Sequence, residues 1–360
     1  MNIVVIADAR LPVPPQHYGG TERIVAMVCR GLQQRGHHVT LLAHPDSTEG
    51  DRLIPHQPPT QAYASRAYRK LWFQGLSLAA IHKADVVYNF GRVDYLWAAL
   101  KTSVPVIARF ANDIRETDLR WLLQQRSQAL ALISISDDQR RHVSHLGNWT
   151  TVYNGVEGDR FPFTSRPAHP GYLAFLGRLT HNKGVHLAIQ VAQKTGLPLK
   201  IAGNISDEPG GRQYFETQVQ PYLSDTIEWV GVVDDAQKVS FLGNAKALLF
   251  PIQWHEPFGI VMAEALSCGT PVIATRWGSA PEVIAHGRTG FLCNDVEDMV
   301  QAVQQIDRID RAHCRSECDR RFSHDRMVDG YLQVYHRLVQ DPRCLPPPSS
   351  WMGKRDSTPS

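Results

Sequence analysis

Residues 255–271 read HEPFGIVMAEALSCGTP and carry the pattern on which the fold assignment rests. The apolar run at 247–252 that precedes them is typical of a buried strand. A Glu-Pro turn then leads into a short apolar helix, which we expect to begin near Phe258 and to stop at the Gly-Thr-Pro sequence. Glu256 lies just before this helix and Glu264 lies about two turns farther along. A carboxylate in an otherwise apolar helix is seldom there for stability alone, so both glutamates are candidate ligand contacts. The alternative is one turn glutamate and one glutamate at the rim of a buried helix.

The rest of the chain repeats one unit, a short apolar strand followed by a helical stretch. This alternation predicts parallel sheets with right-handed crossovers, in which ligands collect at the carboxyl ends of the strands. A chain of 360 residues is long enough for two domains, which we expect over residues 1–164 and 165–323. A helix at about 324–340 and a disordered tail at 341–360 follow. Strands are expected at 2–7, 38–43, 85–90, 105–110 and 129–135 in the first domain, and at 172–177, 199–203, 227–231, 245–251, 271–275 and 289–293 in the second.

Two strand-to-helix loops have the composition of anion-binding sites. Arg178 and Lys183 lie in the loop after the first strand of the second domain, and two fixed cations beside a helix N-terminus suit a diphosphate. Gly19 and Gly20 precede a helix expected at 22–34 and allow the backbone to approach a ligand closely. They do not form the Gly-x-Gly-x-x-Gly dinucleotide fingerprint. The alternatives are two solvated cations and a plain flexible loop.

The two glutamates, with seven residues between them, resemble the Glu-x7-Glu signature of retaining nucleotide-sugar glycosyltransferases of family 4, the glycosyl transferases group 1. The segment Gly177-Arg178-Leu179, followed by Lys183-Gly184, is similar to the phosphate-binding segment of that family. The resemblance spans about residues 1–340. It implies the GT-B fold, an α/β architecture of two Rossmann-like domains facing a central cleft, with the C-terminal helix crossing back to the N-terminal domain. The first domain would then bind the acceptor and the second the donor.

The resemblance also implies a role for each candidate residue. Glu256 would contact the hydroxyl groups of the donor sugar, and Glu264 would contact the ribose. Arg178 and Lys183 would stabilise the departing diphosphate. The other donor contacts would come from the loop of Gly19 and Gly20, the base-binding loop at Val232, and the backbone around Phe258, Gly259 and Ile260.

One position departs from the family pattern. The family usually has a histidine that reaches the donor sugar just after the strand corresponding to residues 105–110. This sequence has Asn112 and Asp113 at that place. Either one of these two residues takes over the sugar contact, or the contact is missing.

The expected reaction is transfer of a sugar, with retention, from a nucleoside-diphosphate sugar to a hydroxyl group of a sugar, lipid-linked or small-molecule acceptor. The resemblance favours a UDP-sugar. The diphosphate itself can take the acceptor proton, so no nucleophile is assigned. No metal or other cofactor is expected, because the six cysteines show no zinc-binding spacing. Two alternatives stay open: a non-catalytic nucleotide-sugar-binding protein, which the missing histidine would allow, and a sugar-nucleotide epimerase with the same fold.

Composition limits the partners and the location. A net charge of +3 gives no reason to expect nucleic acid. No signal-peptide pattern and no apolar run long enough to span a bilayer is evident, which predicts a cytoplasmic protein. A basic and aromatic helix expected at about 61–83, with Trp72 and Phe73, could make a weak peripheral contact at the inner membrane face. The alternative is a helix with one solvated face. The sequence carries no signal for oligomeric state.

Two further segments are interpreted as structural. Ser136-Asp137-Asp138 is typical of a helix N-cap followed by an acidic first turn. The turn at residues 278–282 resembles scaffold near the donor in the same family.

Overall fold

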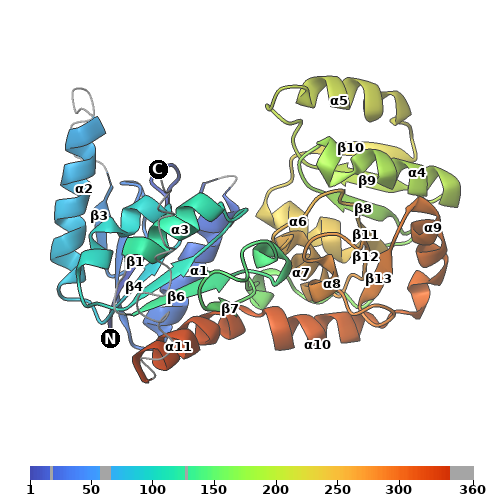
Figure 1. The fold of residues 1–360 in the computed structure, drawn as a ribbon. Helices are drawn as coiled ribbons and strands as arrows, with labels where there is room; N and C mark the ends of the chain where they lie inside the picture. The colour runs from blue at the N-terminus through green and yellow to red at the C-terminus, as the bar shows by residue number, and fades with distance from the viewer. Residues whose placement is uncertain (17–18, 57–65, 126–128, 341–360) are drawn as a thin grey trace, which may run out of the picture.

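The computed structural model describes residues 1–16, 19–56, 66–125 and 129–340, with only the backbone described for 66–71. The expected tail at 341–360 lies outside the described residues. Two separate parallel sheets, each covered by helices, lie side by side in Figure 1. This arrangement confirms the expected fold class.

The first sheet has seven strands in the order β3-β2-β1-β4-β5-β6-β7, and every neighbouring pair is parallel. The order reverses beside β1, which is the place where doubly wound sheets bind ligands. Its elements are β1 (Asn2–Ile6), α1 (Gly20–Gln34), β2 (His38–Ala43), β3 (Arg52–Pro55), α2 (Arg66–Ile81), β4 (Val86–Asn89), β5 (Val106–Arg109), α3 (Glu116–Gln125), β6 (Leu130–Ser134) and β7 (Trp149–Thr151).

The second sheet has six parallel strands in the order β10-β9-β8-β11-β12-β13. It repeats the same reversal beside β8. Its elements are β8 (Leu173–Leu176), α4 (Val185–Thr195), β9 (Leu199–Ala202), α5 (Gly211–Gln218), β10 (Ile227–Gly231), α6 (Asp235–Gly243), β11 (Ala247–Phe250), α7 (Ile260–Ser267), β12 (Val272–Thr275), α8 (Ala280–Val283), β13 (Gly290–Cys293), α9 (Val296–Gln305) and α10 (Arg311–Phe322).

The last helix, α11 (His324–Gln340), returns to the first half of the molecule, as expected (Figure 1). Met327, Val328 and Tyr331 are buried in the core that lies between the first sheet and α1. Arg35 at the end of α1 holds two carboxylates of α11, Asp325 at 3.0 Å and Asp329 at 2.7 Å. Helix α11 therefore packs into the apolar core of the first half, whereas α10, which directly precedes it, packs into the core of the second half.

Several element boundaries differ from the sequence expectations. Helix α7 begins at Ile260 rather than near Phe258, because Gly259 adopts a left-handed conformation at its N-cap. Helix α1 begins at Gly20, two residues before the expected start. The edge strands β3 and β7 and the whole of α10 were not expected from the sequence. No described helix is both long and apolar enough to cross a membrane.

His56 joins the ends of β1 and β2. Its Nε2–H donates to the carbonyl oxygens of Ala7 at 2.8 Å and of Leu42 at 3.1 Å, and its ring stacks on Phe73 with 4.2 Å between centroids. Phe73 is 5% exposed, so it is not available for the peripheral membrane contact considered above. The basic side chains of the same helix at 66–70 lie outside the described side chains.

We expect acid to destabilise the protein through His56. Burial lowers the pKa of this imidazole to about 4, from 6.5 in the unfolded chain. The unfolded state therefore binds the proton first as the pH falls, so stability present above pH 6.5 is lost on the way down to pH 4. The loss amounts to about 2 kcal/mol between pH 7 and pH 5. Urea unfolding at both pH values measures it, with His56→Gln as the comparison. A variant that keeps the full wild-type pH dependence would show that another group is responsible.

Candidate active site

The structure brings Lys183 and Glu256 together. Lys183 ends the turn between β8 and α4, and Glu256 lies in the loop between β11 and α7, at the carboxyl ends of two neighbouring strands. Their side chains form an ion pair in which the lysine is 17% and the glutamate 13% exposed. The ammonium group also lies 5.1 Å from the centre of the Trp254 ring. A carboxylate and an ammonium held at one point can serve two neighbouring groups of one ligand, a hydroxyl and a phosphate.

The backbone around Glu256 is held tightly. The carbonyl oxygen of Glu256 accepts a hydrogen bond from the N–H of Ser279 at 3.0 Å. A Cβ atom at Gly278 would lie 2.4 Å from the nitrogen of Glu256, so only glycine allows this approach. Phe258 anchors the loop from the other side, because its ring is 2% exposed and packs near Tyr153 and Phe322. Only the backbone of Phe258, not its ring, can meet a ligand.

Glu264 has a partner that sequence reasoning missed. It is 7% exposed on α7, and its carboxylate accepts a hydrogen bond from Lys238 of α6 at 2.9 Å. Asp235, at the start of the same α6, pairs with Arg23 in the first turn of α1 at 2.5 Å. Helix α6 therefore connects the first turn of α1, which begins at Gly20, to the helix that carries Glu264. No local pattern marks Lys238, because its partner lies on a different helix.

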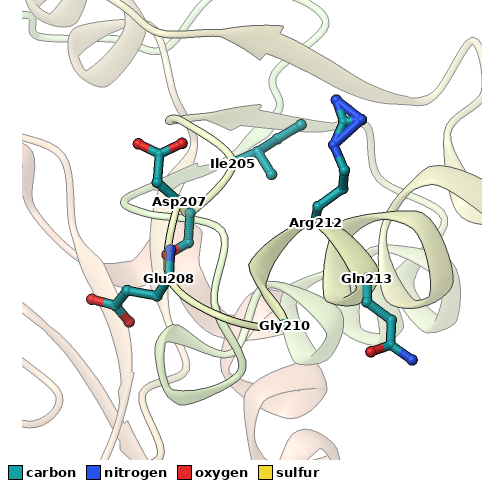
Figure 2. Close-up of a pocket in the computed structure, with 7 residues that line it drawn as sticks. Ile205, Asp207, Glu208, Gly210, Arg212 and Gln213 are labelled. Atoms are coloured by element: carbon teal, nitrogen blue, oxygen red, sulfur yellow. The ribbon is translucent and has the colours of Figure 1, made fainter.

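Arg178 lies in the loop after β8 and is bonded to Glu208 at 2.7 Å. Glu208 belongs to the loop between β9 and α5, which lines a pocket of about 380 Å³. Figure 2 shows Asp207 and Glu208 on this loop, with Arg212 across the pocket on α5. A diphosphate bound at Arg178 would compete with the Glu208 carboxylate for the same guanidinium.

The remaining predicted site residues lie at the expected strand ends. Gly19 is the N-cap residue of α1. A Cβ atom at Gly20 would have no other atom within 4 Å, so there is open space beside the start of the helix. Asn112 and Asp113 are exposed after β5, and the carbonyl oxygen of Asn112 is held by Gln139 at 2.6 Å. Val232, after β10, is 70% exposed, which is unusual for valine.

Two segments interpreted as structural join the halves of the molecule. The Glu282 carboxylate of α8 accepts hydrogen bonds from the backbone N–H groups of Asp137 at 2.7 Å and Asp138 at 2.8 Å. Burial raises the pKa of Glu282, while these two hydrogen bonds oppose the shift. His255 donates from Nδ1 to the carboxylate of Asp138 at 3.0 Å. The residue beside Glu256 is thus bonded directly to the first half of the chain.

Comparison with known proteins identifies the family. The family model for glycosyl transferases group 1 matches residues 159–316, and the model for glycosyltransferase family 4 matches residues 18–160. Together they cover most of the chain, and each candidate site residue lies inside one of them. The chain belongs to the family 4 glycosyltransferases. The segment around Glu256 and Glu264 falls within the first match, and the loop of Gly19 and Gly20 falls within the second.

Curated relatives of this glycosyltransferase are about equally distant. An alpha-maltose-1-phosphate synthase of Mycolicibacterium smegmatis is 29% identical in an alignment of 387 positions, which covers 90% of this chain and 97% of that protein. A glycogen synthase of Mycobacterium tuberculosis is 28% identical over 198 residues, 52% of this chain. The match spans about half, 47%, of the glycogen synthase itself.

Solved structures show the same fold. Sucrose-phosphate synthase from Thermosynechococcus elongatus has a TM-score of 0.74 at 20% identity, covering 94% of this chain and 99% of that one. Anabaena HepE in complex with UDP and glucose has a TM-score of 0.70 at 17% identity, covering 95% and 100%. At these identities the likeness confirms the two-sheet architecture alone.

Proposed function

We propose that the protein is a retaining glycosyltransferase that uses a nucleoside-diphosphate sugar, with a UDP-sugar as the favoured donor. The observation that carries the proposal is the Lys183–Glu256 ion pair, which lies at the carboxyl ends of two neighbouring strands and within the residues that the family model matches. The solved complex of HepE with UDP and glucose supports a UDP-sugar, since HepE has the same fold.

The charge of each side chain determines the role that we propose for it. Lys183 and Arg178 balance the negative charge that grows on the diphosphate as the bond to the sugar breaks. Glu256 accepts hydrogen bonds from sugar hydroxyl groups, and Glu264 from the ribose. In the described structure each of these four side chains already has an oppositely charged partner. Donor binding would therefore exchange these existing ion pairs for contacts with the diphosphate, the sugar and the ribose.

In the proposed reaction the acceptor oxygen attacks the anomeric carbon from the face that the diphosphate leaves. The bond from that carbon to the diphosphate oxygen breaks, the bond to the acceptor oxygen forms, and the acceptor proton passes to the diphosphate. The acceptor would bind on the first half of the molecule. No metal ion is required in this proposal. The cell compartment would be the cytoplasm, which suits five described cysteines that are free and buried.

A thermal-shift screen against UDP, GDP, ADP, dTDP and CMP, with and without magnesium, tests the donor site. We expect one diphosphate to stabilise the protein by several degrees at saturation, independently of the metal. Hydrolysis of the matching sugar nucleotide then tests for an enzyme, and turnover would remove the non-catalytic alternative. Absence of stabilisation by every nucleotide together with absence of hydrolysis would contradict the proposal.

The variant Glu264→Gln tests the ribose contact. We expect it to weaken nucleotide binding by about tenfold, the effect of losing one hydrogen bond to a charged group. The control is Glu297→Gln, which removes a carboxylate from an exposed ion pair with Lys194 in the same half of the chain. Calorimetric titration with UDP measures both. Equal affinities for wild type and Glu264→Gln would remove Glu264 from the nucleotide site.

A further inference from the structure

The ammonium group of Lys183 contacts both a carboxylate and an aromatic ring. It forms the ion pair with Glu256, and its Nζ atom lies over the Trp254 ring, 5.1 Å from the ring centre. Trp254 is partly buried and packs against the apolar core of the second half. Its indole N–H has no hydrogen-bond partner among the described residues. What distinguishes Trp254 from another apolar residue at this place is therefore the contact of its ring with the ammonium group.

Backbone contacts join the two loops that carry the ring and the ammonium group. The N–H of Gln253 donates to the carbonyl oxygen of Asn182 at 2.9 Å, and Trp254 and Lys183 are the next residues of these loops. Gly184 approaches the loop of Trp254 so closely that a Cβ atom there would lie 1.9 Å from a carbonyl oxygen. The placement of the ring beside the lysine thus rests on main-chain contacts and does not depend on the Glu256 carboxylate.

Donor binding would remove the carboxylate partner of this lysine. In the proposed function Glu256 accepts hydrogen bonds from the sugar, while the Lys183 ammonium has to stay where the charge of the diphosphate grows. A carboxylate holds an ammonium group but offsets its charge. The face of an aromatic ring attracts a cation through its quadrupole and carries no net charge. The ring can therefore hold the lysine side chain and leave its full charge to the diphosphate.

The second lysine–glutamate pair of the site has the same arrangement. Lys238 is paired with Glu264, and its Nζ atom lies over the Phe161 ring, 5.7 Å from the ring centre. The side chains of both lysines are 17% exposed. Each glutamate that the proposed function assigns to the donor thus leaves behind a lysine that already lies over an aromatic ring.

We propose that Trp254 is a positioning residue, which holds the Lys183 ammonium over its ring while the donor occupies Glu256. The proposal rests on the glycosyltransferase function proposed above and adds a residue that acts through Lys183. Trp254 itself is assigned no contact with the donor. Its contribution should appear in the turnover number, because a misplaced ammonium group no longer balances the charge that grows as the bond to the sugar breaks.

Fluorinated tryptophans, inserted at position 254 alone, test the contact between ring and cation. Fluorine withdraws electron density from the ring face and changes the size of the ring little. We expect the turnover number to fall stepwise with each added fluorine, by about tenfold for the most fluorinated ring, with a smaller change in KM for the donor. Trp254→Phe keeps a weaker ring face and should retain more activity than Trp254→Leu. A ring that only fills space would show no dependence on fluorine.

Two controls accompany the fluorine series. The same tryptophans are inserted at Trp97, whose ring lies 6.0 Å from Nζ of Lys101 in the first half of the chain, and they should leave turnover unchanged. In Lys183→Met protein, which lacks the ammonium group, fluorine at position 254 should have no effect on the residual rate. A turnover number that is independent of fluorine at 254, or a fluorine effect that persists in Lys183→Met, would overturn the proposal.

A nuclear magnetic resonance experiment tests the contact without turnover and without nucleotide. The Hε protons of a lysine over an indole ring are shifted upfield by the ring current, and Lys183→Arg identifies the signal in protein with ¹³C-labelled lysine. Glu256→Gln removes the ion pair, as donor binding would. We expect the upfield shift to persist in Glu256→Gln and to disappear in Glu256→Gln/Trp254→Leu. Loss of the shift in Glu256→Gln alone would show that the ring does not hold the lysine, and would overturn the proposal. A persistent shift in a protein that turns over no sugar nucleotide would count against the proposed function and leave the contact established.

Discussion

Replacing Lys183 with methionine should lower the turnover number by about 100- to 1,000-fold, the usual effect of removing one group that stabilises transition-state charge. Methionine keeps the length of the side chain and removes only the ammonium group. The leaving diphosphate would then develop its charge next to the Glu256 carboxylate with one cation fewer. The effect should appear in the turnover number more than in the affinity for the ground-state donor, because the charge on the leaving group grows only as the bond breaks.

The ion pair with Glu256 makes a second readout necessary. Removing the lysine leaves a carboxylate that is 13% exposed without its partner, which also lowers stability. The double variant Lys183→Met/Glu256→Gln removes this unpaired charge, so it should regain thermal stability without regaining activity. Lys194→Met is the control, since it breaks an exposed lysine–glutamate pair of the same half of the chain. Initial rates of sugar-nucleotide turnover, corrected for the folded fraction of each variant, separate a loss of catalysis from a loss of stability. A Lys183→Met rate within threefold of the wild type would refute the diphosphate role.

The sequence predicts those site residues that lie close to one another along the chain. Arg178 with Lys183, and Glu256 with Glu264, stand at short and regular spacings, and the structure places all four on strand-to-helix loops or on α7. The sequence does not show their charged partners, because Lys238 and Glu208 belong to other elements and meet the site only in the folded chain.

The same limit applies to the contacts between the two halves. Glu282 was interpreted as part of a scaffold turn, yet its carboxylate binds backbone N–H groups of Asp137 and Asp138 in the other half of the molecule. The interpretation of Ser136-Asp137-Asp138 as an N-cap holds in part, since Oγ of Ser136 accepts from the N–H of Gln139 at 3.1 Å. A pattern within a segment shows that backbone donors need a partner. It does not show that the partner is 144 residues away in sequence.

The secondary structure missed from the sequence has little apolar periodicity. Strands β3 and β7 are edge strands of four and three residues with one or no buried position, so they lack the apolar run of a central strand. Helix α10 reads RAHCRSECDRRF, and its buried face includes a charged residue, Arg311. Cys314 and Cys318 are spaced by one helical turn, but two small residues are too weak an apolar pattern to predict a helix in so polar a segment.

Replacing Gly184 with alanine should lower the free energy of unfolding by about 3 kcal/mol or more, because a left-handed backbone and a steric overlap add together. Gly184 has φ of 74° at the N-cap of α4. A Cβ atom there would lie 1.9 Å from the carbonyl oxygen of Pro251, which follows β11. Pro251 directly follows the buried strand β11, and Gly184 directly precedes Val185, the buried first residue of α4, so neither backbone can move without disturbing the core.

Gly196, at the other end of α4, is the matched control. It has φ of 68°, but no atom lies within 4 Å of its built Cβ, so alanine there should cost only about 1 kcal/mol of left-handed strain. Urea unfolding followed by circular dichroism compares the two variants. The same close approach sets Lys183 beside the loop that carries Glu256, so any folded Gly184→Ala protein should also lose turnover, whereas Gly196→Ala should keep it. Equal stability losses would mean that the contact with Pro251 does not fix the Lys183 loop, and the pairing of Lys183 with Glu256 would need another cause.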